Sequence, residues 1–209
     1  MPYGLATDYP NGWYGSVHGD YSGITVADFT PTISHKITDT IAFGFGLNLQ
    51  YAVAHLTGGI PISGATDIRG DDFGVGYIAG LTWKPIPETR LGISYRSHVR
   101  HKLTGHNEPR GAPSALPGFS HLANGRYSMN ARITTPETVL FSVAQDVGTR
   151  WTLSTLARWT RWSRFSELKI QSTAYRKAGA PTVNTPTVDE DWKNVWMVGG
   201  GIDYDFCKN

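Results

Sequence analysis

Hydrophobic and polar residues alternate from Ile41 to Leu56, and this alternation is the clearest pattern in the chain. Odd positions up to Val53 carry large apolar side chains, whereas even positions carry glycine, alanine or an amide. A period of two predicts a β-strand. Since a tilted strand crosses a bilayer with about 9 to 11 residues, the large side chains are predicted to face lipid and the small ones a lumen.

Six further stretches repeat the alternation. They are residues 29–38, 73–84, 90–103, 126–146, 151–172 and 195–206. Long loops are expected at 57–72, 104–125 and 172–191, and short turns elsewhere. Because short turns and long loops of a membrane barrel lie on opposite sides, 126–146 is predicted to be one strand bent at Pro136. The fold predicted is all-β, an antiparallel up-and-down transmembrane β-barrel.

Composition agrees with this fold and excludes some other classes. Charged residues make up 17% of the chain, below the roughly 25% of a soluble domain. The net charge of +2 is small and the basic residues are scattered, so a nucleic-acid partner is not expected. The single cysteine, Cys207, excludes an internal disulfide and a multi-cysteine metal site.

One face of residues 90–103 is cationic and is expected to line the lumen, because a midplane Arg or Lys facing lipid costs about 2 to 4 kcal/mol. The candidate ligands for a substrate carboxylate are Arg96, His98, Arg100, Lys102, Arg132 and Arg158. Several cationic donors on one wall could bind a carboxylate. The alternative is that they line a solvated wall or pair with the protein's own carboxylates.

Two of the expected loops contain apolar side chains that could form an outer binding groove. They are Ile60, Ile62, Leu116, Phe119 and Leu122. Exposed apolar residues on long loops tend to mark binding surfaces, although they could equally pack the loops together. No metal site is expected, because His98 and His101 would point to opposite faces of a strand. No catalytic motif or cofactor site is found either, so the chain is not expected to be an enzyme.

Several strings together resemble one family. They are YGLATDY (3–9), FGFGLNLQYA (43–52), the segment from Gly70 to Gly105, TPE (135–137) and WTLSTLARWTRWSRFSELKI (151–170). They are similar to FadL-type outer-membrane transporters of long-chain fatty acids and other hydrophobic compounds. The resemblance covers essentially the whole chain, and the segment from Gly70 to Gly105 is its most specific part.

The resemblance implies a fourteen-stranded barrel with an N-terminal hatch, in the outer membrane of a Gram-negative bacterium. A fatty acid or aromatic hydrocarbon would be captured on loops 55–71 and 104–125 and bind in the lumen. It would then leave sideways through a gap at a kink of the third strand, where Gly4 falls on the kink glycine. Outer-membrane lipid, lipopolysaccharide and, for the full-length parent, the barrel assembly machinery are the implied partners.

About eight of the fourteen strands are expected in residues 1–209, which would form one partial barrel domain. The N-terminus has no basic segment followed by an apolar one, so no signal peptide is predicted, and the chain is expected to be a fragment. Two alternatives remain. One is a soluble β-rich carbohydrate-binding or enzymatic domain that uses Trp151, Trp159 and Trp162, and the other is a water-filled porin for polar solutes.

Overall fold

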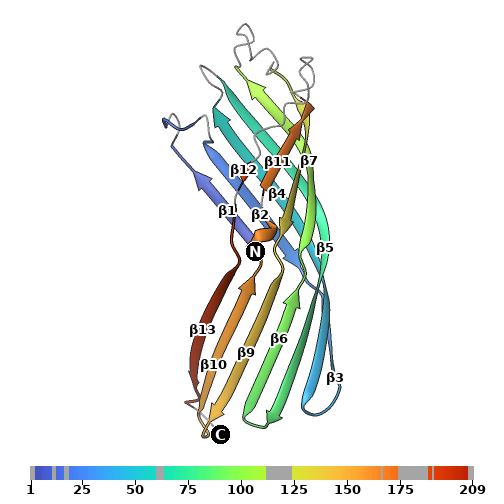
Figure 1. Cartoon of the computed structure of the whole chain (residues 1–209), viewed down its shortest axis with the longest axis vertical. Helices are drawn as coiled ribbons and strands as arrows, with labels where there is room; N and C mark the ends of the chain where they lie inside the picture. The colour runs from blue at the N-terminus through green and yellow to red at the C-terminus, as the bar shows by residue number, and fades with distance from the viewer. Residues whose placement is uncertain are drawn as a thin grey trace.

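Thirteen strands form one curled antiparallel sheet in the computed structural model (Figure 1). The structure describes residues 3–10, 13–16, 19–59, 64–111, 124–165, 167–173, 188–189 and 191–206. The strands are β1 (Tyr3–Asp8), β2 (Tyr21–Phe29), β3 (Thr32–Lys36), β4 (Ile41–Gly59), β5 (Ala65–Ile86), β6 (Thr89–Arg96), β7 (Val99–Arg110), β8 (Tyr127–Thr135), β9 (Thr138–Val147), β10 (Trp151–Thr160), β11 (Glu167–Ser172), β12 (Val188–Asp189) and β13 (Val195–Tyr204). A short 3₁₀ helix, η1 (Trp162–Arg164), lies between β10 and β11.

These thirteen strands form eight runs across the sheet. Five runs consist of two consecutive strands each (β2 and β3, β6 and β7, β8 and β9, β10 and β11, β12 and β13), and β1, β4 and β5 each form a run alone. At the end that carries the short turns, the neighbours are β3, β4, β5, β6, β9, β10 and β13. At the opposite end they are β1, β2, β4, β5, β7, β8, β11 and β12. Only β4 and β5 belong to both series. The predicted half-barrel with about eight strands is confirmed.

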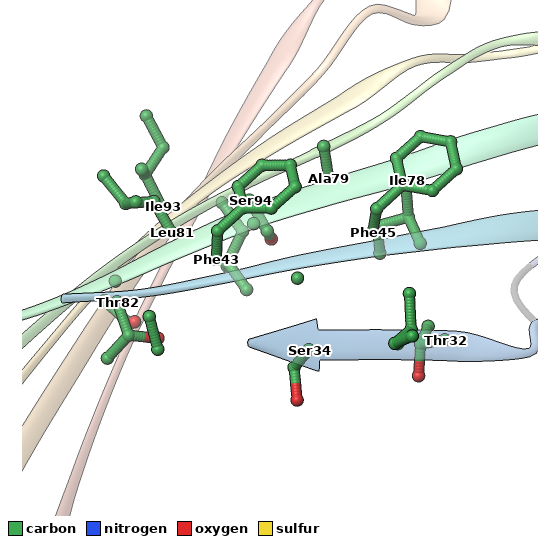
Figure 2. Close-up of a pocket in the computed structure, with 17 residues that line it drawn as sticks. Thr32, Ser34, Phe43, Phe45, Ile78, Ala79, Leu81, Thr82, Ile93 and Ser94 are labelled. Carbon is green, nitrogen blue, oxygen red and sulfur yellow. The ribbon is translucent and has the colours of Figure 1, made fainter. Parts of the chain in front are cut away.

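The half of the sheet next to the short turns is called the turn half. Its large side chains form an exposed belt on the convex face of the sheet. Five of them, from β4, β5 and β6, are between 40% and 45% exposed: Phe43, Phe45, Tyr77, Leu81 and Ile93. Figure 2 shows Phe43 and Leu81 on the opposite side of the strands from Ser34 and Thr82. No second layer covers the belt in the described part of the chain, so the packed core that a soluble domain would require is absent there.

The alternation changes face between β6 and β7, and here the sequence prediction is wrong. Ile78 of β5 pairs with Arg96, whereas Asp71 pairs with Thr104. The second strand therefore holds one residue more than β5 over this interval. An extra residue of this kind is a β-bulge, and it moves every later side chain to the other face. As a result Arg100 and Lys102, predicted to face the lumen, are exposed on the convex face.

Glycines in β5 leave space for Val99 and His101 of β7, which lie on the concave face. Val99 and His101 are 1% and 2% exposed. A Cβ atom at Gly74 would lie 2.5 Å from Val99 Cγ1 and 2.7 Å from His101 Cε1, and one at Gly76 would lie 2.7 Å from Val99 Cγ2. The small side chains of β5 are therefore required where the bulged strand packs across it.

Residues 126–146 form one bent strand, as predicted, and not a hairpin, since β8 pairs with β7 and β11 while β9 pairs with β6 and β10. The bend at Pro136 also reverses the faces. Phe141 of β9 is 44% exposed, whereas Met129 and Ile133 of β8 are buried. Arg132 is consequently exposed on the convex face, which corrects its predicted position in the lumen.

Two of the expected loops are partly strand. β4 continues to Gly59, β5 begins at Ala65 and β7 continues to Arg110, so much of 57–72 and the first part of 104–125 lie in the sheet. Their side chains are mostly polar or small on both faces, and such a strand shows no hydrophobic period. The sheet therefore extends beyond the lipid-facing belt.

A small apolar core lies on the concave face of this extension, where the sheet curls most tightly. Its buried members come from β2, β4, β7 and β8: Val26, Ala52, Ala54, Leu103, Met129, Ala131 and Ile133. Because strands that are not neighbours contact one another here, the core holds the two sides of the curled sheet together.

Candidate functional site

An apolar cavity of about 280 Å³ lies on the concave face beside the core. Its walls come from β1, β2, β8 and the segments that follow β10 and precede β13. The apolar lining consists mainly of Ile24, Val26, Ile133, Pro136, Trp162 and Phe165. Gly4 of the edge strand β1 also lines it. A concave site with apolar walls and few polar groups is typical of small-molecule binding sites.

Three aromatic side chains close one side of the cavity. The rings of Trp162 and Trp192 lie edge to face with their centroids 5.0 Å apart, and the ring of Phe165 is also 5.0 Å from that of Trp192. The 3₁₀ helix η1 interrupts the strand after Thr160 and presents Trp162 to the cavity. Edge-to-face pairs are a preferred arrangement of aromatic rings, so these rings form a rigid apolar wall.

A charged cluster lies next to this aromatic wall. The side chain of Glu137 is only 6% exposed and accepts hydrogen bonds from Arg161 Nη1 at 3.1 Å and from Arg164 Nε at 2.9 Å. His98 Nδ1 lies 4.0 Å from the same carboxylate. Two guanidinium groups therefore share one carboxylate, which leaves one positive charge in excess on residues that are chain neighbours of the cavity-lining Trp162 and Phe165.

Below the cavity, polar side chains connect opposite strands of the curled sheet. Gln50 Oε1 of β4 accepts a hydrogen bond from Thr135 Oγ1 of β8 at 3.1 Å and lies 3.1 Å from His101 Nε2. Arg96 Nη1 of β6 donates to Asp28 Oδ2 of β2 at 2.5 Å. Thr135 also lines the cavity, so this polar layer adjoins the cavity at that residue.

The structure separates the predicted carboxylate ligands. Arg96 lies on the concave face and is paired with Asp28. His98 is partly exposed near Glu137, and Arg158 is exposed with its Nη2 3.3 Å from Met197 Sδ. The other three, Arg100, Lys102 and Arg132, lie on the convex face. The predicted ladder of cations along the lumen therefore does not form.

The remaining predicted site residues have different outcomes. The loop residues Ile60, Ile62, Leu116, Phe119 and Leu122 lie outside the residues that the structure describes. Gly4 lines the cavity and pairs with Thr25 of β2. A Cβ atom added at Gly4 would meet nothing within 4 Å, so the space beside this glycine is open. The kink itself stays a prediction.

Sequence reasoning named Gly4 and Trp162 but did not predict the cavity that they line, nor the charged cluster beside it. One string, RWTRWSRF, contains Arg161, Trp162, Arg164 and Phe165, and it lies within the stretch 151–172 that the alternation predicts as one strand. Its regular interleaving of arginine and aromatic residues was the available signal. Trp192 carried no such signal, because only the curl of the sheet brings it to Trp162 and Phe165.

Neither a metal site nor a membrane-spanning helix is found among the described residues. No group of three or more His, Cys, Asp or Glu side chains there could hold a metal ion. No helix in that part of the chain is long and apolar enough to cross a membrane.

The chain is similar to known transport proteins over its whole length. It is 23% identical over 249 aligned positions to the long-chain fatty acid transport protein of Escherichia coli O6:H1, covering 99% of this chain and 52% of that protein. It is 25% identical to the long-chain fatty acid transport protein of Salmonella typhi, covering 82% of this chain and 46% of that protein. The chain thus spans about half the length of these two relatives.

Solved structures show the same fold. A Pseudomonas aeruginosa FadL homologue superimposes with a TM-score of 0.81 at 24% identity, over 98% of this chain and 51% of that one. The Ralstonia pickettii toluene transporter TbuX superimposes with a TM-score of 0.76 at 14% identity, over 99% of this chain and 61% of that one. Both superpositions match the curled sheet to between half and two thirds of a solved barrel chain.

The family described as Outer membrane protein transport protein (OMPP1/FadL/TodX) matches residues 1–209. This match confirms the predicted family and the outer membrane of Gram-negative bacteria as its location. It also agrees with the prediction that the chain is not an enzyme. The exposed belt, the curled sheet and this match show that the chain belongs to the FadL/TodX family of outer-membrane transport proteins.

Proposed function

We propose that the protein to which this chain belongs transports hydrophobic compounds passively across the outer membrane. The observation that carries the proposal is the apolar cavity on the concave face, which borders the edge strand β1. Neither nucleotide nor metal takes part. The compound is captured on apolar residues of the outer loops, binds in the cavity and leaves sideways into lipid beside β1.

Long-chain fatty acids are the substrate that the charges favour. The cavity walls offer an acyl chain an apolar surface, and burial of apolar area drives such binding at roughly 25 cal/mol per Å². The excess positive charge of Arg161 and Arg164 lies beside the aromatic wall, where a carboxylate could share the guanidinium groups with Glu137. A neutral aromatic hydrocarbon has no charged group that could pair with these guanidinium groups.

The exit is proposed to lie beside Gly4. This residue is on β1, whose described backbone partner is β2, and the space next to it is open. A larger side chain would project into that opening. The glycine would thus allow a ligand to pass between the cavity and the surrounding lipid.

Residues 1–209 are proposed to be one partial barrel domain. The remaining strands would come from outside this chain, and the barrel assembly machinery would insert the complete protein. An open sheet leaves unpaired backbone groups at its edges, which lipid cannot hydrogen-bond, so closure is required for transport.

The test compares two ligands in the complete barrel, a fatty acid and a monoaromatic hydrocarbon. Arg164→Gln is expected to weaken fatty-acid binding about tenfold, because a charge-assisted hydrogen bond is lost, and to leave hydrocarbon binding unchanged. Gly4→Leu is expected to slow uptake of both ligands, with Gly200→Leu on the edge strand β13 as a matched control. Uptake that is unaffected by Gly4→Leu would contradict the exit, and equal loss of both ligands in Arg164→Gln would contradict the choice of substrate.

A further inference from the structure

The convex face of β7 and β8 carries a cluster of basic residues with no assigned role. Lys102 and Arg132 are direct cross-strand partners, and Arg100 lies two residues from Lys102 on the same face. All three are exposed. Directly opposite residues on one face have Cβ atoms about 4.5 to 5.5 Å apart, and like charges at this spacing repel each other.

These cations differ from the other basic residues on the same face. Arg69 is 3.0 Å from an Asp67 oxygen, and Arg110 and Arg126 are 2.6 Å and 3.5 Å from Glu108 oxygens. Within the described ranges, no carboxylate oxygen lies within 4 Å of the side-chain nitrogens of Arg100, Lys102 or Arg132. Two acids lie near the cluster, and each is engaged elsewhere. Asp71 pairs with Thr104 and accepts a hydrogen bond from Tyr51 at 3.1 Å, while the Asp72 carboxylate accepts from the backbone N–H of Lys102 and lies 3.3 Å from His101 Nδ1. Carboxylates in the described part of this face thus neutralise Arg69, Arg110 and Arg126 and leave Arg100, Lys102 and Arg132 available to an external anion.

The cluster lies at the border between the lipid-facing belt and water. The backbone N–H of Lys102 donates to Asp72 at 3.0 Å, and the residue after Asp72 is Phe73 of the belt, which is 59% exposed. β7, with its partner β8, lies in the half of the sheet away from the short turns (Figure 1). Short turns of outer-membrane barrels face the periplasm, so the border is at the outer leaflet.

We infer that Arg100, Lys102 and Arg132 form a docking surface for the phosphorylated headgroup of lipopolysaccharide in the outer leaflet. Its acyl chains lie along the belt at Phe73 and Val75, and its phosphate lies between Lys102 and Arg132. Arginine offers a planar fork of donors that matches phosphate, while lysine adds a compact charge. Thr134 and Asn130 on the same face of β8 supply further hydrogen-bonding groups. This contact anchors the protein in its membrane and is independent of the transported compound.

The experiment measures binding of bisphosphorylated lipid A to the complete barrel in detergent by native mass spectrometry. Lys102→Gln/Arg132→Gln is expected to weaken binding by roughly 25-fold, since each basic residue near an anionic lipid strengthens binding by roughly fivefold. The matched control, Arg110→Gln/Arg126→Gln, removes the same charge from the same face but from residues already paired with Glu108. It is expected to bind lipid A like the wild type.

Two further arms identify the source of the phosphate and guard against misfolding. Dephosphorylated lipid A is expected to bind weakly, and inorganic phosphate at millimolar concentration is expected not to displace lipid A. The exchange Lys102→Arg/Arg132→Lys keeps both charges and is expected to retain binding. Equal binding of dephosphorylated lipid A, displacement by inorganic phosphate, loss of binding in the charge-retaining exchange, or equal effects of the two glutamine variants would each overturn the proposal.

Discussion

At the scale of single residues, burial distinguishes ion pairs that contribute to the stability of the fold from exposed pairs that contribute little. Asp28 and Arg96 join β2 to β6 across the concave face, with side chains 10% and 24% exposed. Arg69, in contrast, is 56% exposed in its pair with Asp67. A charge left unpaired away from water loses hydration that nothing replaces, whereas an exposed one is solvated. The two pairs should therefore respond differently to the loss of one partner.

Asp28→Asn should lower the free energy of unfolding of the complete barrel by about 3 kcal/mol, because Arg96 then remains charged and unpaired. Arg69→Gln should lower it by less than about 1 kcal/mol. Urea unfolding in lipid vesicles, followed by tryptophan fluorescence, measures both values. Equal losses in the two variants would show that the pair across the concave face is not special.

The exposed cluster around Asp67 should make stability depend on pH. Burial acts to raise the pKa of Asp67, but its hydrogen bond and charge pairing with Arg69 outweigh this, so the pKa lies below its usual value. His55 Nε2 is also 3.2 Å from this carboxylate. A lowered pKa in the folded state adds stability above the unfolded pKa of about 3.9, and this stability is lost as the pH falls through the folded value.

Asp67→Asn is therefore expected to be less stable than the wild type at pH 7. The difference should shrink as the pH falls below about 4, where the wild-type carboxylate becomes protonated. Thermal unfolding midpoints at pH 7 and pH 3 measure the effect. A difference that stays the same at both pH values would contradict this assignment of the pairing.

At the scale of elements, one extra residue between β6 and β7 decides which surface the second strand presents. In this run β6 follows the simple alternation of the sequence, whereas β7, beyond the bulge, presents the opposite set of positions on each face. The reversal places Leu103, which is 0% exposed, in the core. It places Lys102 outside, where it contributes to the basic cluster on the convex face.

Cysteine scanning tests this reversal directly. With Cys207 replaced by Ser, a cysteine at Lys102 should react readily with a water-soluble maleimide, and one at Leu103 should resist it because that position is buried. Mass spectrometry of the labelled complete barrel provides the measurement. The same cysteines in urea serve as the control for intrinsic reactivity. Faster labelling at position 103 than at position 102 would contradict the reversal and support the simple alternation.

At the scale of the whole molecule, the sheet is curled but open. Its edge strands at the turn end are β3 and β13, and at the opposite end β1 and β12. Backbone groups at an open edge lack partners, which lipid cannot supply. A chain of residues 1–209 alone is therefore expected not to insert as a stable monomer.

Refolding this chain into lipid vesicles checks the expectation. Without the remaining strands, it should aggregate or remain sensitive to added protease, because its edges stay unpaired. The complete barrel in the same vesicles serves as the positive control. A protease-protected monomer of residues 1–209 would show that the edges are satisfied in some other way.

The sequence alone determined the strand period, the lipid-facing belt and the family, because each is written in local patterns such as the alternation from Ile41 to Val53. It also placed the bend at Pro136 correctly, since loop lengths restrict which side of the membrane a connection occupies. These features depend on residues close together in the chain or on the count between them.

The tertiary structure decided the faces of the extension and the composition of the site. A bulge adds one residue without any strong sequence mark, so the side on which Arg100 and Lys102 lie could not be read from alternation. The cavity joins Gly4, Trp162 and Trp192, which are distant in sequence and meet only because the sheet curls. Contacts that depend on curvature are set by the summed twist of many strands, and no local pattern encodes that sum.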